Sequence, residues 1–284
     1  MINVLVTGSN GQLGSCIKEL ALNHSNINFI YTDYLELDIC NLDKVYAFFE
    51  SQKDIHYCIN CAAYTAVDKA ESDVEKAFEI NALGPKNLAL ACFKNSTTLI
   101  HVSTDFVFDG KHSMPYTEID EPNPISVYGK SKLKGEEEIT CIFNKFFIIR
   151  TSWLYSEYCQ NFLITMLRLS KERKELSIVA DQIGTPTYAK DLAKVILKIV
   201  KGNNKNYGTY HYSNEGISSW YDFAKAIFDI QNSAVKVHPI KTEAYPTPAK
   251  RPLFSVLNKT KIKSKLGISV PYWRDSLRAA LSNL

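Results

Sequence analysis

Long apolar segments and an excess of one charge are both missing from this chain of 284 residues. No apolar run approaches the roughly 20 residues that a helix needs to span a bilayer. The 33 lysine and arginine residues nearly balance the 30 aspartate and glutamate residues, which leaves a net charge of +3. So small an excess offers no broad basic surface, and we expect no nucleic-acid or membrane partner. The first residues also lack the features of a signal peptide, so we expect a cytoplasmic protein.

A disulfide framework is absent as well, because the seven cysteines are odd in number and scattered through apolar segments. Cys58 and Cys61 form a C-x-x-C pair, which is found in redox sites and zinc sites but also fits two small residues of a buried strand. No second pair follows at zinc spacing, and no helix begins there to lower a thiol pKa. The sequence therefore favours the strand, and no metal site is expected.

The first half of the chain alternates β-rich runs with helical patterns. Its strands are almost continuously apolar, which is typical of a parallel sheet covered by helices on both faces. We therefore predict an α/β protein with a doubly wound, Rossmann-type parallel sheet. The expected strands are 2–7, 28–31, 57–61, 97–103 and 146–151, and the expected helices are 12–23, 42–52, 72–93 and 127–140.

After residue 150 the alternation becomes looser, and residues 245–252 are rich in proline. We expect residues 1–150 to form a dinucleotide-binding domain, to which the chain returns at about 181–202. Residues 151–180 and 203–284 would form a smaller α/β substrate-binding domain. The expected elements of this half are helices 161–171, 189–201, 219–229 and 273–281 and strands 177–180 and 208–212.

Three glycines at three-residue spacing lie between the first strand and the first helix, in the segment Gly8-Ser9-Asn10-Gly11-Gln12-Leu13-Gly14. The first glycine permits a tight turn, the second lets the backbone approach a pyrophosphate, and the third lets the helix pack closely on the strand. The helix N-terminus adds N–H groups and a partial positive charge. This arrangement predicts a dinucleotide site that includes Gln12 and Leu13, and a glycine-rich turn without a ligand is the weaker alternative.

Two acidic residues follow the second strand at the distance where a dinucleotide site holds the adenosine ribose. Asp33 fits a hydrogen bond to a ribose hydroxyl, although aspartate is also common where strands end. Asp38, with Ile39, would border the adenine, but an ordinary loop position is about equally compatible with the sequence. After the third strand, small residues leave room for a cofactor in the segment Ala62-Ala63-Tyr64-Thr65.

A tyrosine and a lysine four residues apart begin the helix at 127–140 and therefore share one face of it. The ammonium of Lys132 would lower the pKa of Tyr128, which could then act as a general acid toward a carbonyl oxygen. This spacing is common in exposed helices. Here, however, the preceding strand ends in His101-Val102-Ser103-Thr104-Asp105, which brings hydroxyl groups to the carboxyl edge of the sheet. The order of these segments predicts a reductase site.

With these segments, the chain resembles the extended short-chain dehydrogenase/reductases and, among them, the dTDP-4-dehydrorhamnose reductase family. The similarity spans nearly the whole chain, and its most specific segments are residues 65–71 and 245–252. It implies a reduction of the 4-keto group of dTDP-4-dehydro-β-L-rhamnose by NADPH or NADH, which gives dTDP-L-rhamnose. It further implies that Tyr128 is the proton donor, that Lys132 is its electrostatic partner and that Thr104 orients the carbonyl. Thr104, Asp105 and Trp153 would contact the nucleotide sugar, although Trp153 could also be an ordinary core residue.

Two departures from the family pattern leave questions open. Some members are described as dimers bridged by magnesium on glutamates, but the corresponding positions here are near Cys16 and at Lys190, which cannot serve as carboxylate ligands. We therefore expect no magnesium site of that kind, and a homodimer stays open.

Asp33 favours NADH, whereas the family is commonly assigned NADPH. Arg251 could pair with a diphosphate or be a solvated charge.

The alternatives that remain differ in substrate or in class. A UDP-linked sugar or a combined epimerase/reductase reaction would use the same chemistry on another substrate. A non-catalytic cofactor-binding subunit, like the regulatory subunit of methionine adenosyltransferase, is also compatible with the fold. The complete set of Thr104, Tyr128 and Lys132 argues against this last alternative.

Overall fold

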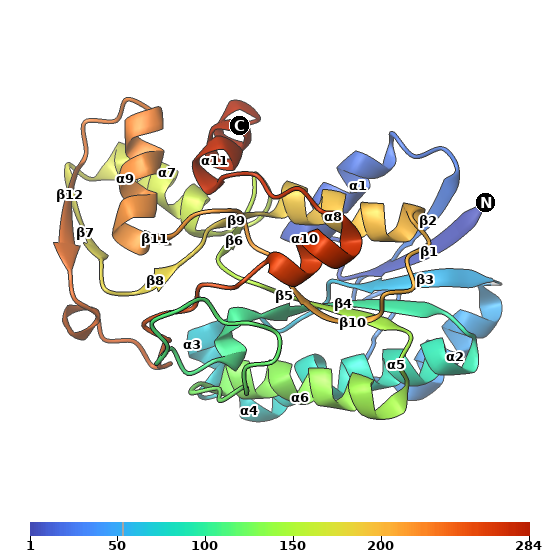
Figure 1. The fold of residues 1–284 in the computed structure, drawn as a ribbon. Helices are drawn as coiled ribbons and strands as arrows, with labels where there is room; N and C mark the ends of the chain where they lie inside the picture. Colours follow the sequence, from blue (N-terminus) through green and yellow to red (C-terminus); the bar gives the residue numbers. More distant parts are fainter. Residues whose placement is uncertain (53) are drawn as a thin grey trace.

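A parallel sheet of six strands forms the centre of the computed structural model, which describes residues 1–52 and 54–284 (Figure 1). Its strand order is β10-β5-β4-β3-β1-β2, and every neighbouring pair is parallel. The predicted doubly wound α/β fold is confirmed. The strands are β1 (Ile2–Thr7), β2 (Ile27–Tyr31), β3 (Ile55–Asn60), β4 (Thr98–Thr104), β5 (Phe146–Thr151) and β10 (Gly208–His211).

Successive residues of the central strands face two different layers of helices. Val4 and Val6 of β1 belong to one apolar core and Leu5 to the other, because side chains alternate between the faces of a strand. Figure 1 shows the two layers above and below the sheet. The first layer contains α1 (Gln12–Ala21), α8 (Ala189–Lys201) and α10 (Thr260–Leu266), and the second contains α2 (Leu42–Ser51), α5 (Gly84–Lys94) and α6 (Val127–Ile142).

The helix predicted at 72–93 begins at Val74 and contains a π-helical turn. It consists of α4 (Val74–Phe78), the π-helical turn Glu79–Leu83 and α5, and it follows the short helix α3 (Val67–Ala70). Pro85 has no N–H group to donate to the carbonyl of Asn81, so the regular helical hydrogen bonding is interrupted there. The apolar periodicity predicted a helix, but it did not indicate this turn.

A smaller layer, on the left in Figure 1, packs around its own apolar core. In it, β7 (Glu175–Val179) pairs in parallel with β12 (Lys236–Ile240). Its helices are α7 (Phe162–Glu172), α9 (Trp220–Ile230) and α11 (Trp273–Ser282). The sequence did not predict β12 or α10, because β12 is largely exposed and contains a proline and α10 is short and rich in lysine.

The strand at 208–212 was assigned to the smaller domain, but the structure pairs β10 with β5 at the edge of the central sheet. A run of four residues does not show which sheet it will join, because that depends on the partner strand. Two short pairs lie where the chain passes between the layers, namely β6 (Leu154–Tyr155) with β9 (Thr187–Tyr188) and β8 (Ile183–Gly184) with β11 (Ser218–Ser219). Apart from β10, the division into two domains stays a prediction.

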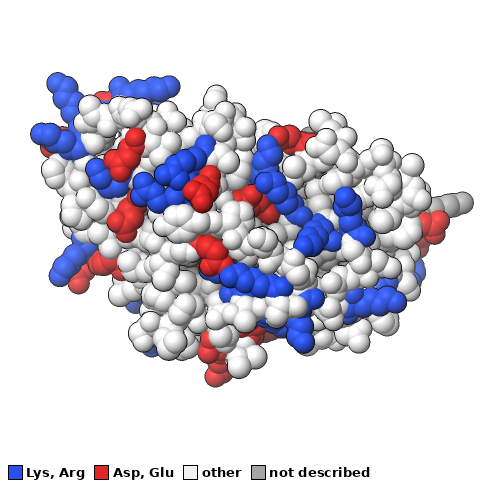
Figure 2. All heavy atoms as spheres, turned by 45° about the horizontal axis from the view of Figure 1, so that its top comes forward, with Lys and Arg blue, Asp and Glu red and all other residues white. Residues whose placement is uncertain are grey.

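Charged side chains of both signs are interspersed over the face shown in Figure 2. Ion pairs in the described chain include Lys194–Asp191 and Lys263–Glu215. Within residues 1–52 and 54–284, no helix has both the length and the apolar character needed to cross a membrane.

Candidate active site

A cleft of about 960 Å³ opens at the carboxyl edge of the sheet, where β1, β3 and β4 end. The strand order reverses between β1 and β3, and ligands of open α/β sheets bind at such a point. Tyr64 does not line the cleft, because its hydroxyl turns away to donate to Asp73 at 3.0 Å. The other predicted site residues all line it: Gly8, Gly11, Gln12, Leu13, Asp33, Asp38, Ile39, Ala62, Ala63, Thr65, Thr104, Asp105, Tyr128, Lys132 and Trp153.

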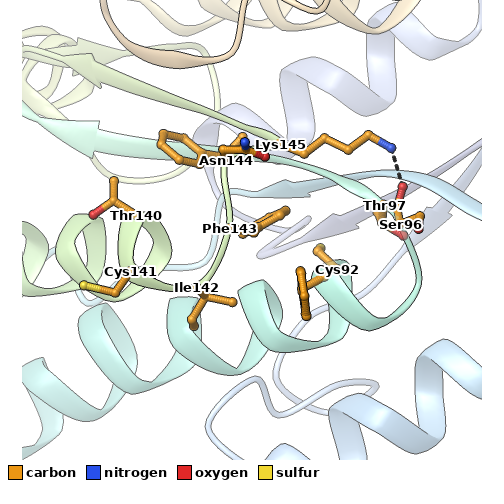
Figure 3. Close-up of a pocket in the computed structure, with 11 residues that line it drawn as sticks. Cys92, Ser96, Thr97, Thr140, Cys141, Ile142, Phe143, Asn144 and Lys145 are labelled. Atoms are coloured by element: carbon orange, nitrogen blue, oxygen red, sulfur yellow. Dashed lines mark hydrogen bonds between the residues drawn. The ribbon is translucent and has the colours of Figure 1, made fainter.

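A second hollow of about 760 Å³ lies at the opposite edge of the sheet, between the C-terminal ends of α5 and α6 (Figure 3). Cys92 comes from the first helix and Ile142 from the second, and Lys145 donates across to the carbonyl of Ser96. None of the predicted site residues reaches this hollow.

The glycine segment forms a tight turn directly against the end of β3. Gly8 has φ of +63°, and an added Cβ would lie 2.5 Å from the backbone nitrogen of Ala62. A Cβ on Gly14 would lie 2.5 Å from the Cα of Ser9, so α1 packs as closely as predicted. Gly11 caps α1 without a side-chain hydrogen bond, and the first turn contains no acidic residue. N–H groups at this helix end are therefore open to an anion, which fits the diphosphate of a dinucleotide.

The carboxylate of Asp33 is fixed at the mouth of the cleft by two backbone groups. Its Oδ2 accepts from the N–H of Asn10 at 3.0 Å, and its Oδ1 accepts from the N–H of Tyr34 at 2.8 Å. A carboxylate has further lone pairs, so Asp33 can still accept a ribose hydroxyl. Asp38 accepts from the N–H of Cys40 at 3.0 Å, which places it as a loop-shaping residue on the same wall.

Tyr128 reaches Thr104 because the start of α6 packs unusually close to the end of β4. Ser126 caps the helix by accepting from the N–H of Gly129 at 3.1 Å. A Cβ on Gly129 would lie 2.2 Å from the carbonyl oxygen of Phe106, so only glycine allows this approach. Tyr128 and Thr104 both line the cleft, where their side chains interact.

The expected lowering of the Tyr128 pKa by Lys132 is not found. Burial raises the pKa of Tyr128 to about 12, and the hydrogen bond with Thr104 offsets only part of this effect. Lys132 instead donates to the carbonyl of Val102 at 2.7 Å, and its Nζ lies 3.4 Å from Nε2 of His101. Tyr128 therefore keeps its proton at neutral pH, as a general acid must.

Thr104 and Asp105 present oxygen atoms beside Tyr128. The Thr104 hydroxyl donates to Oδ1 of Asp105 at 3.1 Å and accepts from the N–H of Phe106 at 3.2 Å. Burial raises the pKa of Asp105 to about 6. In the part of the chain that is described, Oδ2 of Asp105 has no hydrogen-bond partner although it is buried. Buried acceptors are rarely left unpaired, so this oxygen is suited to a hydroxyl group of a ligand.

Trp153 lies flat against Trp220, with ring centroids 3.6 Å apart and planes at 8°. Its backbone has φ of +46°, which is strained for a side chain of this size. Gly184 makes room for the ring, because a Cβ there would lie 2.6 Å from it. Both tryptophans line the cleft, so Trp153 is not an ordinary core residue. No pattern in the sequence indicated that Trp220 would line the cleft.

Comparison with known proteins agrees with this geometry. A family model described as the RmlD substrate binding domain matches residues 2–284. The chain belongs to the RmlD family.

Several named proteins are similar to this chain over nearly their full lengths. A dTDP-4-dehydrorhamnose reductase of Aggregatibacter actinomycetemcomitans is 43% identical over 98% of both chains. The crystal structure of a dTDP-4-dehydrorhamnose reductase from Clostridium acetobutylicum has a TM-score of 0.95, with 45% identity and 99% of each chain covered. The enzyme of that name from Bacillus anthracis, in complex with NADP, has a TM-score of 0.96, with 41% identity and full coverage of both chains.

Arg251 has a role in this RmlD family chain that neither interpretation of the sequence foresaw. It forms a two-armed ion pair with Asp68, with Nη2 2.7 Å from Oδ2 and Nη1 3.0 Å from Oδ1. The backbone N–H of Ala249 also donates to Asp68, at 3.2 Å. Asp68 is on α3 and Arg251 is in the Pro-rich segment, so the pair ties the two halves of the chain together at the cleft. Both residues lie in the segments that carried the family resemblance, but their pairing could not be read from the sequence.

A buried ion pair that the sequence analysis did not predict lies behind Lys132. Arg150 at the end of β5 contacts Glu136 with two nitrogens, the closer at 2.7 Å. Ser103 also donates to Glu136, at 2.5 Å. Glu136 is one helical turn after Lys132 and raises its pKa, but burial has the larger effect and lowers the pKa of Lys132 to about 8.

The positions where the RmlD family pattern suggested magnesium ligands have other roles here. Lys190 forms an ion pair with Glu19, and Cys16 is buried in the core. Residues 1–52 and 54–284 contain no group of three or more His, Cys, Asp or Glu side chains arranged to hold a metal ion. Cys58 and Cys61 are free thiols, and Cys58 is buried as expected for a strand residue.

Proposed function

We propose that this chain reduces the 4-keto group of dTDP-4-dehydro-β-L-rhamnose with NADPH or NADH to give dTDP-L-rhamnose, the last step of dTDP-rhamnose biosynthesis. The observation that carries the proposal is the placement of Tyr128 beside Thr104 in a cleft that also contains a dinucleotide cradle. The names of its relatives at 43% and 45% identity support the choice of substrate.

The residues of the cleft divide the work of this reaction. A bound nicotinamide supplies the hydride that reaches C4 of the sugar. Tyr128 donates its proton to the C4 oxygen as negative charge develops there, and Thr104 turns its hydroxyl proton from Asp105 to that oxygen to hold it. The buried, unpaired Oδ2 of Asp105 accepts a sugar hydroxyl, and Trp153 packs against the deoxysugar.

The cofactor cradle is formed by Gly8, Gly11, Gln12 and Leu13 at the start of α1 and by Ala62 and Ala63 after β3. Asp33 holds the adenosine ribose and would repel a 2′-phosphate, so we expect NADH to be used at least as well as NADPH. The relative from Bacillus anthracis binds NADP, so the rates with NADH and with NADPH should be measured side by side. A cytoplasmic location and a homodimer stay predictions from the sequence.

The decisive test mixes the purified protein with dTDP-4-dehydrorhamnose and either NADH or NADPH, and follows the absorbance of the reduced cofactor. We expect oxidation of the cofactor with dTDP-L-rhamnose as the product. Tyr128→Phe keeps the ring but removes the proton, so it should lower kcat by about 10²- to 10⁴-fold with unchanged circular dichroism. Cofactor binding without turnover would refute the proposal and favour another nucleotide sugar or a regulatory subunit.

A further inference from the structure

Behind Lys132, a chain of buried polar side chains runs from the cofactor cradle to the amine. Thr7 at the end of β1 donates to Oδ1 of Asn60 at 2.8 Å, and the amide of Asn60 lies 3.0 Å from Nδ1 of His101. The other ring nitrogen of His101 lies 3.4 Å from Nζ of Lys132. Asn60 and His101 are fully buried, so each of their hydrogen-bonding groups must find its partner among neighbouring protein groups.

The backbone N–H of Ala62 fixes the direction of every hydrogen bond from Thr7 to His101. The N–H of Ala62 lies 3.1 Å from the side chain of Asn60, and because an N–H group can only donate, the atom that faces it is the amide oxygen. The NH₂ group of Asn60 therefore points at His101 and donates to Nδ1. Since Nδ1 accepts, a neutral imidazole must carry its proton on Nε2, the nitrogen that faces Lys132.

We propose that His101 is a positioning residue for Lys132, because its Nε2–H group faces Nζ and binds the uncharged amine rather than the ammonium. An ammonium has only donors, so it cannot accept from Nε2–H, whereas the amine can. This inference rests on the proposed function for its meaning in the reaction. After Tyr128 gives its proton to the sugar, the phenolate must regain a proton. Lys132 lines the same cleft, and when it loses its own proton His101 stabilises the amine that remains.

The surrounding charges are consistent with this assignment. Burial lowers the pKa of His101 well below its usual value, so the ring is neutral. The charged and titratable groups that face Lys132 are His101 from β4, Glu136 from its own helix and Cys61 after β3. Glu136 favours the ammonium but is already paired with Arg150, and burial keeps Cys61 a neutral thiol by raising its pKa.

The first test reads the tautomer directly in the wild-type protein. Nitrogen-15 NMR of histidine-labelled protein distinguishes a ring protonated on Nε2 from one protonated on Nδ1, and the His101 signal is assigned by its loss in His101→Phe. We expect the Nε2–H form. His211 is a matched internal control, because its Nδ1 faces the carbonyl of Tyr116 at 3.1 Å and must donate, which gives the opposite tautomer. An Nδ1–H form or an imidazolium at His101 near neutral pH would overturn the proposal, whether or not the enzyme turns over.

The second test is the pH dependence of kcat/KM for the reduction, which falls at alkaline pH as Lys132, with a pKa of about 8, loses its proton. His101→Phe removes the Nε2–H group. Asn60→Asp replaces the donor with an acceptor, so His101 turns a lone pair toward Lys132. Both changes favour the ammonium, and both should move the alkaline limb upward by about one pH unit. His211→Phe, a buried histidine outside the cleft, should leave the limb in place.

The outcomes separate the two proposals. Reduced kcat with an unmoved alkaline limb in both His101→Phe and Asn60→Asp would mean that His101 only fills space, and it would refute the positioning role. A wild-type protein without reductase activity would refute the proposed function, while the tautomer would still decide this inference. If the His101 and Asn60 variants do not fold, variants of the other five histidines assign the His101 signal by elimination, and the wild-type NMR spectrum then decides the question.

Discussion

At the scale of single residues, the site keeps a carboxyl group almost fully shielded from water. Asp105 is 2% exposed, and only one of its oxygens is paired within the described chain. Residues near a reaction centre often sacrifice folding stability in this way, because the group must stay ready for a ligand. The raised pKa of Asp105 reflects this cost.

Asp105→Asn should therefore stabilise the protein at neutral pH. The folded pKa of about 6 lies above the usual 3.8, so the carboxyl group favours the folded state most at low pH. This contribution is lost as the pH rises through about 6, by up to about 3 kcal/mol for two pKa units. Asparagine avoids that loss and can still accept from Thr104. Urea unfolding should show a gain of about 2 kcal/mol over wild type at pH 7, which disappears near pH 4. An equal difference at both pH values would contradict the explanation.

At the scale of elements, the close packing of α6 places the proton donor. Gly129 lets the start of α6 approach β4, and Gly135 lets its middle approach the π-helical turn of α4–α5. Asn81 in that turn donates to Ser131 of α6 at 3.0 Å, so the turn and the helix are joined by a side-chain contact as well. The π turn therefore supports the site, as such turns often do.

Gly135→Ala should disturb the packing of α6 against the π-helical turn. The added Cβ would lie 2.1 Å from the carbonyl oxygen of Asn81, a backbone atom that cannot rotate away. We expect a loss of about 1–3 kcal/mol in the free energy of unfolding, because one element must move. A fall in kcat/KM should accompany it as Tyr128 shifts. Lys130→Ala, an exposed position on the same helix, is the control and should change stability by less than about 0.5 kcal/mol. Equal stability of the two variants would show that α6 moves freely.

At the scale of the whole molecule, the Asp68–Arg251 pair connects α3 with the C-terminal Pro-rich segment at the edge of the cleft. Hydrogen bonds from Arg251 hold the pKa of Asp68 below its usual value. The side chains are 40% and 24% exposed, so solvent weakens the interaction, and the pair contributes little to stability. Its effect should instead be on the shape of the cleft.

Arg251→Ala should accordingly weaken substrate binding while leaving the stability of the protein almost unchanged. We expect the free energy of unfolding to fall by less than about 1 kcal/mol. The KM for the nucleotide sugar should rise about tenfold, because each tenfold change needs only about 1.4 kcal/mol of lost positioning. Asp68→Ala and the double variant complete a thermodynamic cycle. If the double variant is no worse than either single one, Arg251 acts through Asp68. An additive effect would mean that Arg251 also contacts the ligand.

The sequence alone determined the central fold and most of the site. Apolar strands separated by helices specify a covered parallel sheet, and parallel strands bring their carboxyl ends to one edge. The glycine segment, Thr104, Asp105, Tyr128 and Lys132 follow such ends in the chain, so their meeting in one cleft could be predicted. Local patterns carry this information because each depends on residues that are near one another in sequence.

Tertiary structure alone decided what depends on distant partners. Arg251 lies 183 residues from Asp68 in the sequence, and β10 belongs to the central sheet because it pairs with β5. The pKa of Tyr128 was predicted to fall, but it rises because burial outweighs the opposing effect of Thr104. The proton on His101 is fixed by the N–H of Ala62 through Asn60. Burial and hydrogen-bond direction are properties of the packed molecule, and no local segment of the sequence contains them.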